Sequence, residues 1–153
     1  MTHSDRTLSR SAGTTESAAS RLAERLQAGD VVLLEGDLAA GKTTFVRGLL
    51  KGLGGSPADV SSPSFVLLQT YDCNAPQLRR VHHVDLYRLD NRVADLREVG
   101  LSDVLSDTEA VVAVEWPKDT LATWIPTDAR VWWVVIAIEE DDARSIEISP
   151  PEG

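Results

Sequence analysis

The sequence contains one cysteine, Cys73, among its 153 residues. A disulfide within the chain needs two thiols, and a cysteine-based zinc site needs several, so neither can form here. A chain without disulfides suits a reducing compartment, and we therefore expect a cytoplasmic protein.

Long hydrophobic runs are also missing. The longest, Val131 to Ile138, is far shorter than the ~20 residues that cross a bilayer, and acidic residues follow it at 139–142. We expect a buried strand there and no membrane partner. The amino terminus lacks an apolar signal core, so residues 1–10 are expected to form a flexible tail.

Positive charge is scarce, with 15 Lys and Arg against 24 Asp and Glu and a formal net charge of −9. Nucleic-acid backbones are held mainly by Lys and Arg, which excludes a broad electrostatic grip on RNA or DNA. We expect any link to nucleic acid to be indirect. The acidity favours solubility, or a protein partner with a basic face.

The length suits one domain, for which we expect residues 11–149, followed by a short tail at 150–153. Apolar runs predict strands, and amphipathic segments predict helices between them. The two expected strands Phe65–Tyr71 and Arg80–Leu86 flank a short turn and suggest an antiparallel pair. The fold class is therefore α/β, a single domain with a mixed central sheet and helices on both faces.

Further elements follow from the same signals. The sequence predicts a helix through Leu22 and Leu26, a helix that Asp90 would cap and that would end at Gly100, a shorter one capped by Ser102, and one beginning near Pro117. Predicted strands are Val31–Glu35, Ala110–Glu115, Arg130–Glu139 and Arg144–Ser149, the last two forming a hairpin across an acidic turn.

The most specific pattern is a GxxxxGK[ST] motif, here called the phosphate loop, which reads Gly36-Asp37-Leu38-Ala39-Ala40-Gly41-Lys42-Thr43-Thr44. It follows a predicted strand and precedes an amphipathic helix, as this motif requires. Backbone N–H groups of such a loop surround the phosphates of a nucleotide, and the helix start adds partial positive charge. Lys42 would reach the β- and γ-phosphate oxygens, and the Thr43 hydroxyl would complete a magnesium shell. We predict that residues 37–44 bind the nucleotide and that the α/β domain is P-loop NTPase-like.

Two acidic residues close apolar strands and are candidates for the remaining chemistry. Glu115 follows Ala110–Val114, and Asp85 follows Arg80–Val84. A nucleoside triphosphate site needs an acidic group near its magnesium ion. We assign Glu115 to magnesium, and Asp85 to orienting or deprotonating the attacking water.

The adjacent residues His82 and His83 would face opposite sides of a strand, so only one could point into a site. We expect no histidine metal site.

Four segments together carry a resemblance: GDLAAGKTTF at 36–45, SSPSFVLLQTY at 61–71, HVDLYRL at 83–89 and VEWP at 114–117. From about Thr15 to Arg144 the chain resembles the TsaE (YjeE) family. These are small bacterial P-loop ATPases required for the threonylcarbamoyladenosine modification of tRNA, and they work with the proteins TsaB and TsaD.

The resemblance implies phosphate binding at Lys42 and Thr43, magnesium at Thr43 and Glu115, and a catalytic role for Asp85. It also implies a nucleotide-responsive switch at residues 62–65, where Ser64 replaces the family's usual threonine but keeps a hydroxyl. Lys42, Asp85 and Ser64 are therefore the expected catalytic set. Ala39 stands where the family commonly has glycine, and Arg144 matches an arginine that contacts the nucleotide.

Three functions use such a loop. The leading one is an ATP-hydrolysing accessory protein that acts on TsaB and TsaD and meets tRNA only through them. The second is a small-molecule kinase, which needs an acceptor pocket and an arginine-bearing lid that the sequence does not show. The third is a GTPase-type switch, but the guanine-reading NKxD and the DxxG are missing, since 116–119 reads WPKD. ATP with Mg²⁺ is therefore the expected ligand.

Overall fold

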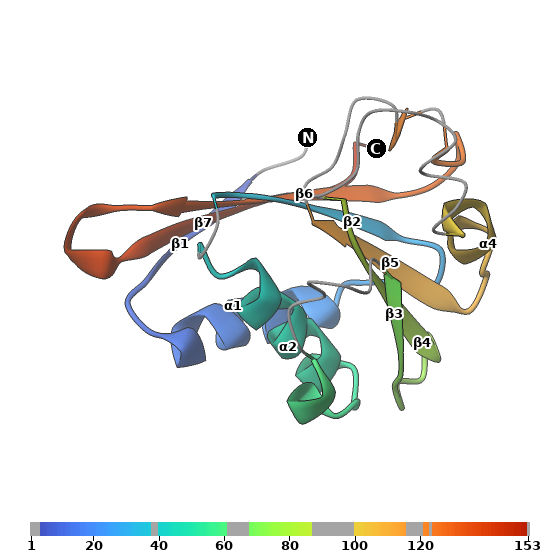
Figure 1. Ribbon diagram of the computed structural model, residues 1–153, viewed down its shortest axis with the longest axis horizontal. Coiled ribbons are helices and arrows are strands. Elements are labelled where there is room, and N and C mark those ends of the chain that lie inside the picture. Colours follow the sequence, from blue (N-terminus) through green and yellow to red (C-terminus); the bar gives the residue numbers. More distant parts are fainter. Residues whose placement is uncertain are drawn as a thin grey trace.

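A computed structural model describes residues 4–37, 40–60, 68–86, 100–115, 121–122 and 124–152. These residues form a seven-stranded sheet in the order β1-β7-β6-β2-β5-β4-β3 (Figure 1). The strands are β1 Asp5–Ser9, β2 Val31–Glu35, β3 Leu68–Asp72, β4 Arg80–Asp85, β5 Ala110–Glu115, β6 Val131–Ile138 and β7 Arg144–Ser149.

The sheet is mixed. β6, β2, β5 and β4 are parallel neighbours, whereas β1 with β7, β6 with β7, and β3 with β4 pair antiparallel. The predicted mixed sheet, the antiparallel β3–β4 pair and the β6–β7 hairpin are confirmed. A short 3₁₀ turn, η3 Glu140–Asp142, joins the two hairpin strands.

Helices cover both faces of the sheet. On one face lie α1 Ala12–Ala23 and α2 Lys42–Gly52, side by side (Figure 1). Their apolar residues pack on the β2 and β5 residues Val32, Leu34, Val111 and Ala113. The alternate residues of β2 and β5 face the other way, where α4 Leu101–Leu105 contributes Leu101 and Val104. This alternation gives the domain two cores, one on each side of a central sheet.

Small residues let α1 and α2 pack closely. A Cβ at Gly48 of α2 would lie 2.4 Å from the Glu16 carbonyl oxygen and 2.7 Å from the Ala19 Cβ, both on α1. The Ser20 hydroxyl donates to the Gly48 carbonyl at 2.9 Å across the same contact. This close approach fixes α2, and with it the loop at its amino end, against the sheet.

Three sequence expectations need correction. Residues 5–9 belong to β1 and not to a flexible tail, because β7 supplies a hydrogen-bonding edge that local sequence cannot reveal. The first helix ends at Ala23, so Leu26 follows it although it is buried. Ser102 lies inside α4, whose cap is Gly100 in the left-handed conformation with φ 77°.

Other expectations fall outside the described residues, namely the helix that Asp90 would cap, the start of the strand at Phe65 and the helix near Pro117. The short 3₁₀ turn η1 Pro57–Asp59 precedes the undescribed segment 61–67. Within the described part of the chain, no helix has the length and apolar character needed to cross a membrane.

Candidate nucleotide-binding site

The phosphate loop connects β2 to α2, and two glycines permit its path. A Cβ at Gly36 would stand 2.5 Å from the main-chain oxygen of Ile136 on β6, so no larger residue fits without a shift. Gly41 has φ 113° and is the residue from which α2 begins. Glycine is needed there for its backbone conformation and not for space, because a Cβ would have no atom of the described residues within 4 Å. Leu38 and Ala39 lie outside the described residues.

Lys42, the first residue of α2, points back into its own loop. Its side chain is buried, and Nζ donates to the carbonyl oxygens of Gly36 at 2.5 Å and Asp37 at 3.0 Å. Burial lowers the pKa of Lys42, while the charges of Glu115, Asp85 and Asp37 act in the opposite direction. An ammonium group is therefore held inside the loop with carboxylates near it.

Asp85 and Glu115 close neighbouring parallel strands at the same edge of the sheet. They are partners in the β4–β5 register. Side chains alternate between the two faces of a strand, and this alternation puts both residues on the face that α1 and α2 cover. Glu115 is only 4 % exposed, whereas Asp85 is half-buried. The two predicted acidic residues and Lys42 thus belong to one region. The upward effect of both carboxylate charges on the pKa of Lys42 also indicates this.

Thr43 and Thr44 follow Lys42 in the first turn of α2 and are both half-buried. The described residues contain no group of three or more His, Cys, Asp or Glu side chains that could hold a metal ion by themselves. A cation here would need other oxygen ligands in addition to the protein's carboxylates. Phosphate oxygens and water are the usual partners of Mg²⁺ in such sites.

Arg144, the first residue of β7, lies against the phosphate loop. Its Nε donates to the Ala40 carbonyl at 3.2 Å, and its Nη1 donates to the Asp142 carbonyl at 2.8 Å. A cavity of about 200 Å³ opens beside this contact. The cavity is lined by Ser9, Arg10, Ser11, Ala12, Thr15, Ala40, Gly41, Thr44, Asp142 and Arg144. Residues from both ends of the chain therefore meet at the loop.

The two adjacent histidines have different surroundings. His83 is fully buried on the face of β4 that carries Asp85, and its Nε2 contacts Oε2 of Glu115. His82 faces the other side, where Nε2 lies 2.8 Å from Oδ2 of Asp107 and Nδ1 lies 2.8 Å from the Thr70 hydroxyl. The sequence predicted that the two rings diverge. It did not predict the contact between His83 and Glu115, which depends on the neighbouring strand.

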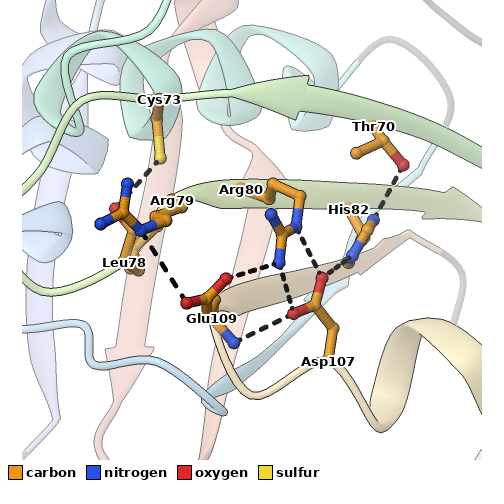
Figure 2. Close-up of polar contacts among 8 residues, drawn as sticks. All are labelled: Thr70, Cys73, Leu78, Arg79, Arg80, His82, Asp107 and Glu109. Atoms are coloured by element: carbon orange, nitrogen blue, oxygen red, sulfur yellow. Dashed lines mark hydrogen bonds and ion pairs between the residues drawn. The ribbon is translucent and has the colours of Figure 1, made fainter.

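His82 belongs to a polar cluster at the opposite end of β4 (Figure 2). Arg80, the first residue of β4, forms two hydrogen bonds to the Asp107 carboxylate, at 2.9 and 3.0 Å, and one to Glu109 at 3.0 Å. The pKa of Asp107 is lowered chiefly by its hydrogen bonds from Arg80. This cluster ties β4 to the turn before β5 and lies away from the phosphate loop, which is at the strands' carboxyl ends.

Ser64, which the family resemblance implies at the site, lies outside the described residues.

Comparisons with known proteins give a matching family, curated relatives and a solved structure. The model of the family described as "Threonylcarbamoyl adenosine biosynthesis protein TsaE" matches residues 9–146. A "tRNA threonylcarbamoyladenosine biosynthesis protein TsaE" of Streptomyces coelicolor is 45% identical over 98 residues, which is 63% of this chain and 62% of that protein. A protein of the same name from a Nostoc species is 37% identical over 131 residues, covering 84% of this chain and 75% of that protein.

The fold is also found in a solved structure, titled "Crystal structure of Bacillus subtilus YdiB". It superposes with a TM-score of 0.70 at 26% identity, covering 99% of this chain and 88% of that one. The chain spans about three fifths of the length of several curated relatives that it matches, 62% for the Streptomyces protein and 57% for one from Rickettsia felis.

Proposed function

The chain belongs to the TsaE family, and on that premise we propose that it is a magnesium-dependent ATPase that assists the formation of N6-threonylcarbamoyladenosine in tRNA. The observation that carries the proposal is the buried Lys42 inside a glycine-flanked loop, with the carboxylates of Glu115 and Asp85 near enough to influence its pKa. Relatives named for this biosynthesis support the pathway.

The loop would bind the phosphates of ATP. Backbone N–H groups of residues 37–44 and the start of α2 favour negative charge, and Lys42 would exchange its carbonyl partners for phosphate oxygens. The cavity beside Arg144 and Ala40 is next to this loop, and we assign it to the nucleoside part of ATP. Arg144 would contact the nucleotide from there.

The donor set fits Mg²⁺. Thr43 offers a hydroxyl and Glu115 a carboxylate, both hard oxygen ligands, and the triphosphate and water would supply the others. Bound Mg²⁺ would neutralise charge that develops on the phosphates during hydrolysis. Asp85, which is more exposed than Glu115, would orient the attacking water and accept its proton. The Ser64 hydroxyl would contact the γ-phosphate or this water.

The partners we propose are TsaB and TsaD, with ATP hydrolysis resetting their complex. A net charge of −9 disfavours direct binding of tRNA and suits a protein surface of opposite charge, so tRNA would be reached through the complex. Turnover without the partners is expected to be weak. The setting for this reaction is the cytoplasm.

The test is ATP hydrolysis by the purified chain in the presence and absence of Mg²⁺, alone and with TsaB and TsaD from the same organism. Lys42→Ala, which we expect to lose nucleotide binding, serves as the blank. Magnesium-dependent turnover that TsaB and TsaD stimulate would support the proposal. Nucleotide binding with no partner effect, but with phosphate transfer to an added small acceptor, would favour a small-molecule kinase. Absence of nucleotide binding would overturn both.

A further inference from the structure

We propose that His83 is a positioning residue for Glu115, its Nε2–H holding one carboxylate oxygen so that the other is presented to the metal ion. The inference rests on the proposed function, in which Glu115 is a magnesium ligand. It adds a residue that the sequence motifs did not assign to the site.

The two side chains meet across neighbouring strands. His83 on β4 and Glu115 on β5 both face the side of the sheet that carries α1 and α2, and Nε2 of the ring contacts Oε2 of the carboxylate. His83 has no exposed surface, and Glu115 is 4 % exposed. A buried carboxylate is costly without a hydrogen-bond donor, and His83 supplies one.

The surroundings of the ring determine which nitrogen carries its proton. Nδ1 of His83 is buried and has no hydrogen-bond partner among the described residues. The tautomer with a proton on Nδ1 would bury an unsatisfied N–H and turn a lone pair of Nε2 towards the carboxylate oxygen. The tautomer with a proton on Nε2 avoids both costs. His83 therefore acts as a fixed donor to Glu115.

This donor matters because Glu115 has a competing attraction. The positive charge of Lys42 interacts with Glu115, as the pKa of Lys42 indicates. A carboxylate freed from His83 could rotate towards that ammonium, away from the position that a metal ligand needs. A residue that hydrogen-bonds to a metal ligand orients that ligand, and its loss typically lowers metal affinity about 10- to 100-fold.

Three variants test the proposal, with affinity for a non-hydrolysable ATP analogue measured by calorimetry in Mg²⁺ and in EDTA. His83→Gln places an amide N–H the same number of bonds from Cα as Nε2. His83→Asn places it at the level of Nδ1, and His83→Leu removes it. We expect Asn and Leu to weaken binding in Mg²⁺ by about 10- to 100-fold and to leave binding in EDTA nearly unchanged. Gln should restore most of the wild-type affinity in Mg²⁺.

Circular dichroism and thermal unfolding establish whether each variant is folded. If His83→Leu does not fold, the comparison of His83→Gln with His83→Asn still tests the proposal. Equal affinity of Gln and Asn in Mg²⁺ would overturn the positioning role, as would equal losses in Mg²⁺ and EDTA. If the wild-type chain binds the analogue equally with and without Mg²⁺, the proposed magnesium site itself fails, and this inference fails with it. His82→Gln, which alters the opposite face of β4, is the control and should match the wild type in both conditions.

Discussion

Asp85 lies directly opposite Glu115 in the parallel register of β4 and β5. The strand β2 pairs with β5 on its other side and leads into the phosphate loop, so the carboxyl ends of three parallel strands bring both acids to the loop. Their surroundings differ, because Glu115 is buried against His83 while Asp85 is partly exposed. The two carboxylates therefore suit different tasks, one holding a cation and the other meeting water.

The first prediction separates these two tasks by replacing each carboxylate with an amide of the same shape. Glu115→Gln is expected to weaken ATP binding in Mg²⁺, because an amide oxygen is a poorer ligand than a carboxylate. Asp85→Asn is expected to keep binding and to lower the hydrolysis rate by about 10²- to 10⁴-fold, the usual contribution of a general base. Calorimetry and a phosphate-release assay on both variants measure the two effects. Loss of binding by folded Asp85→Asn would contradict its assignment.

The second prediction concerns the contact between Arg144 and Ala40. The Arg144 guanidinium reaches the Ala40 and Asp142 carbonyls from different nitrogens, a fork that a lysine ammonium cannot reproduce. Arg144→Lys should keep the charge but lose part of this geometry, and we expect ATP affinity to fall by about 5- to 10-fold, as the loss of one or two hydrogen bonds implies. Arg21→Lys on the exposed surface of α1 is the matched control. Wild-type affinity in Arg144→Lys would show that charge alone suffices.

A third prediction compares two glycines that both lie in helices. Alanine stabilises an exposed helical position by roughly 0.5–1 kcal/mol relative to glycine. Gly13 in α1 is exposed, and among the described residues an added Cβ would meet only the Ser11 Oγ, at 3.8 Å, so Gly13→Ala should stabilise the fold. A Cβ at Gly48 would collide with α1, so Gly48→Ala should destabilise it despite the better helix propensity. Urea unfolding of both variants tests this, and a stabilised Gly48→Ala would refute the close packing of α1 and α2.

The central strands could be predicted from sequence because they are buried on both faces. Val31–Glu35 and Ala110–Glu115 are continuous apolar runs, and they coincide with β2 and β5. β1 could not be predicted in the same way, because Asp-Arg-Thr-Leu-Ser is short and polar. It is a strand because it pairs with β7, at the other end of the chain. Long-range pairing of this kind leaves no local pattern.

The same distinction applies to the site. The positions of Lys42, Asp85 and Glu115 follow from a motif and from strand ends, which are local features. The contact of His83 with Glu115 depends on the pairing of two strands, and that of Arg144 with Ala40 on the path of β7. For Arg144 only the family resemblance pointed to the site. For His83, the signal available in the sequence was that it shares a strand face with Asp85, two residues later.

The last prediction concerns acid stability and the cluster around Asp107. Its carboxylate accepts two hydrogen bonds from Arg80, one from the Glu109 backbone N–H and one at His82 Nε2 (Figure 2). Hydrogen bonding from Arg80 is the chief cause of the lowered pKa of Asp107. A carboxyl whose pKa is lower in the folded than in the unfolded state stabilises the fold above its unfolded value, about 3.9. That stabilisation is lost as the pH falls from there through the folded pKa.

Asp107→Asn should therefore have a lower melting temperature than the wild type at neutral pH, by roughly 2–4 °C for each kcal/mol lost. The difference should narrow steadily below about pH 4, because the unfolded wild-type chain then takes up a proton that the asparagine variant cannot. Thermal unfolding from pH 7 to pH 2.5 measures this, with Glu24→Gln at the exposed end of α1 as a charge-matched control. A difference that stays constant over this range would mean that the variant acts by altered packing, because protonation of Asp107 would then contribute nothing to acid unfolding.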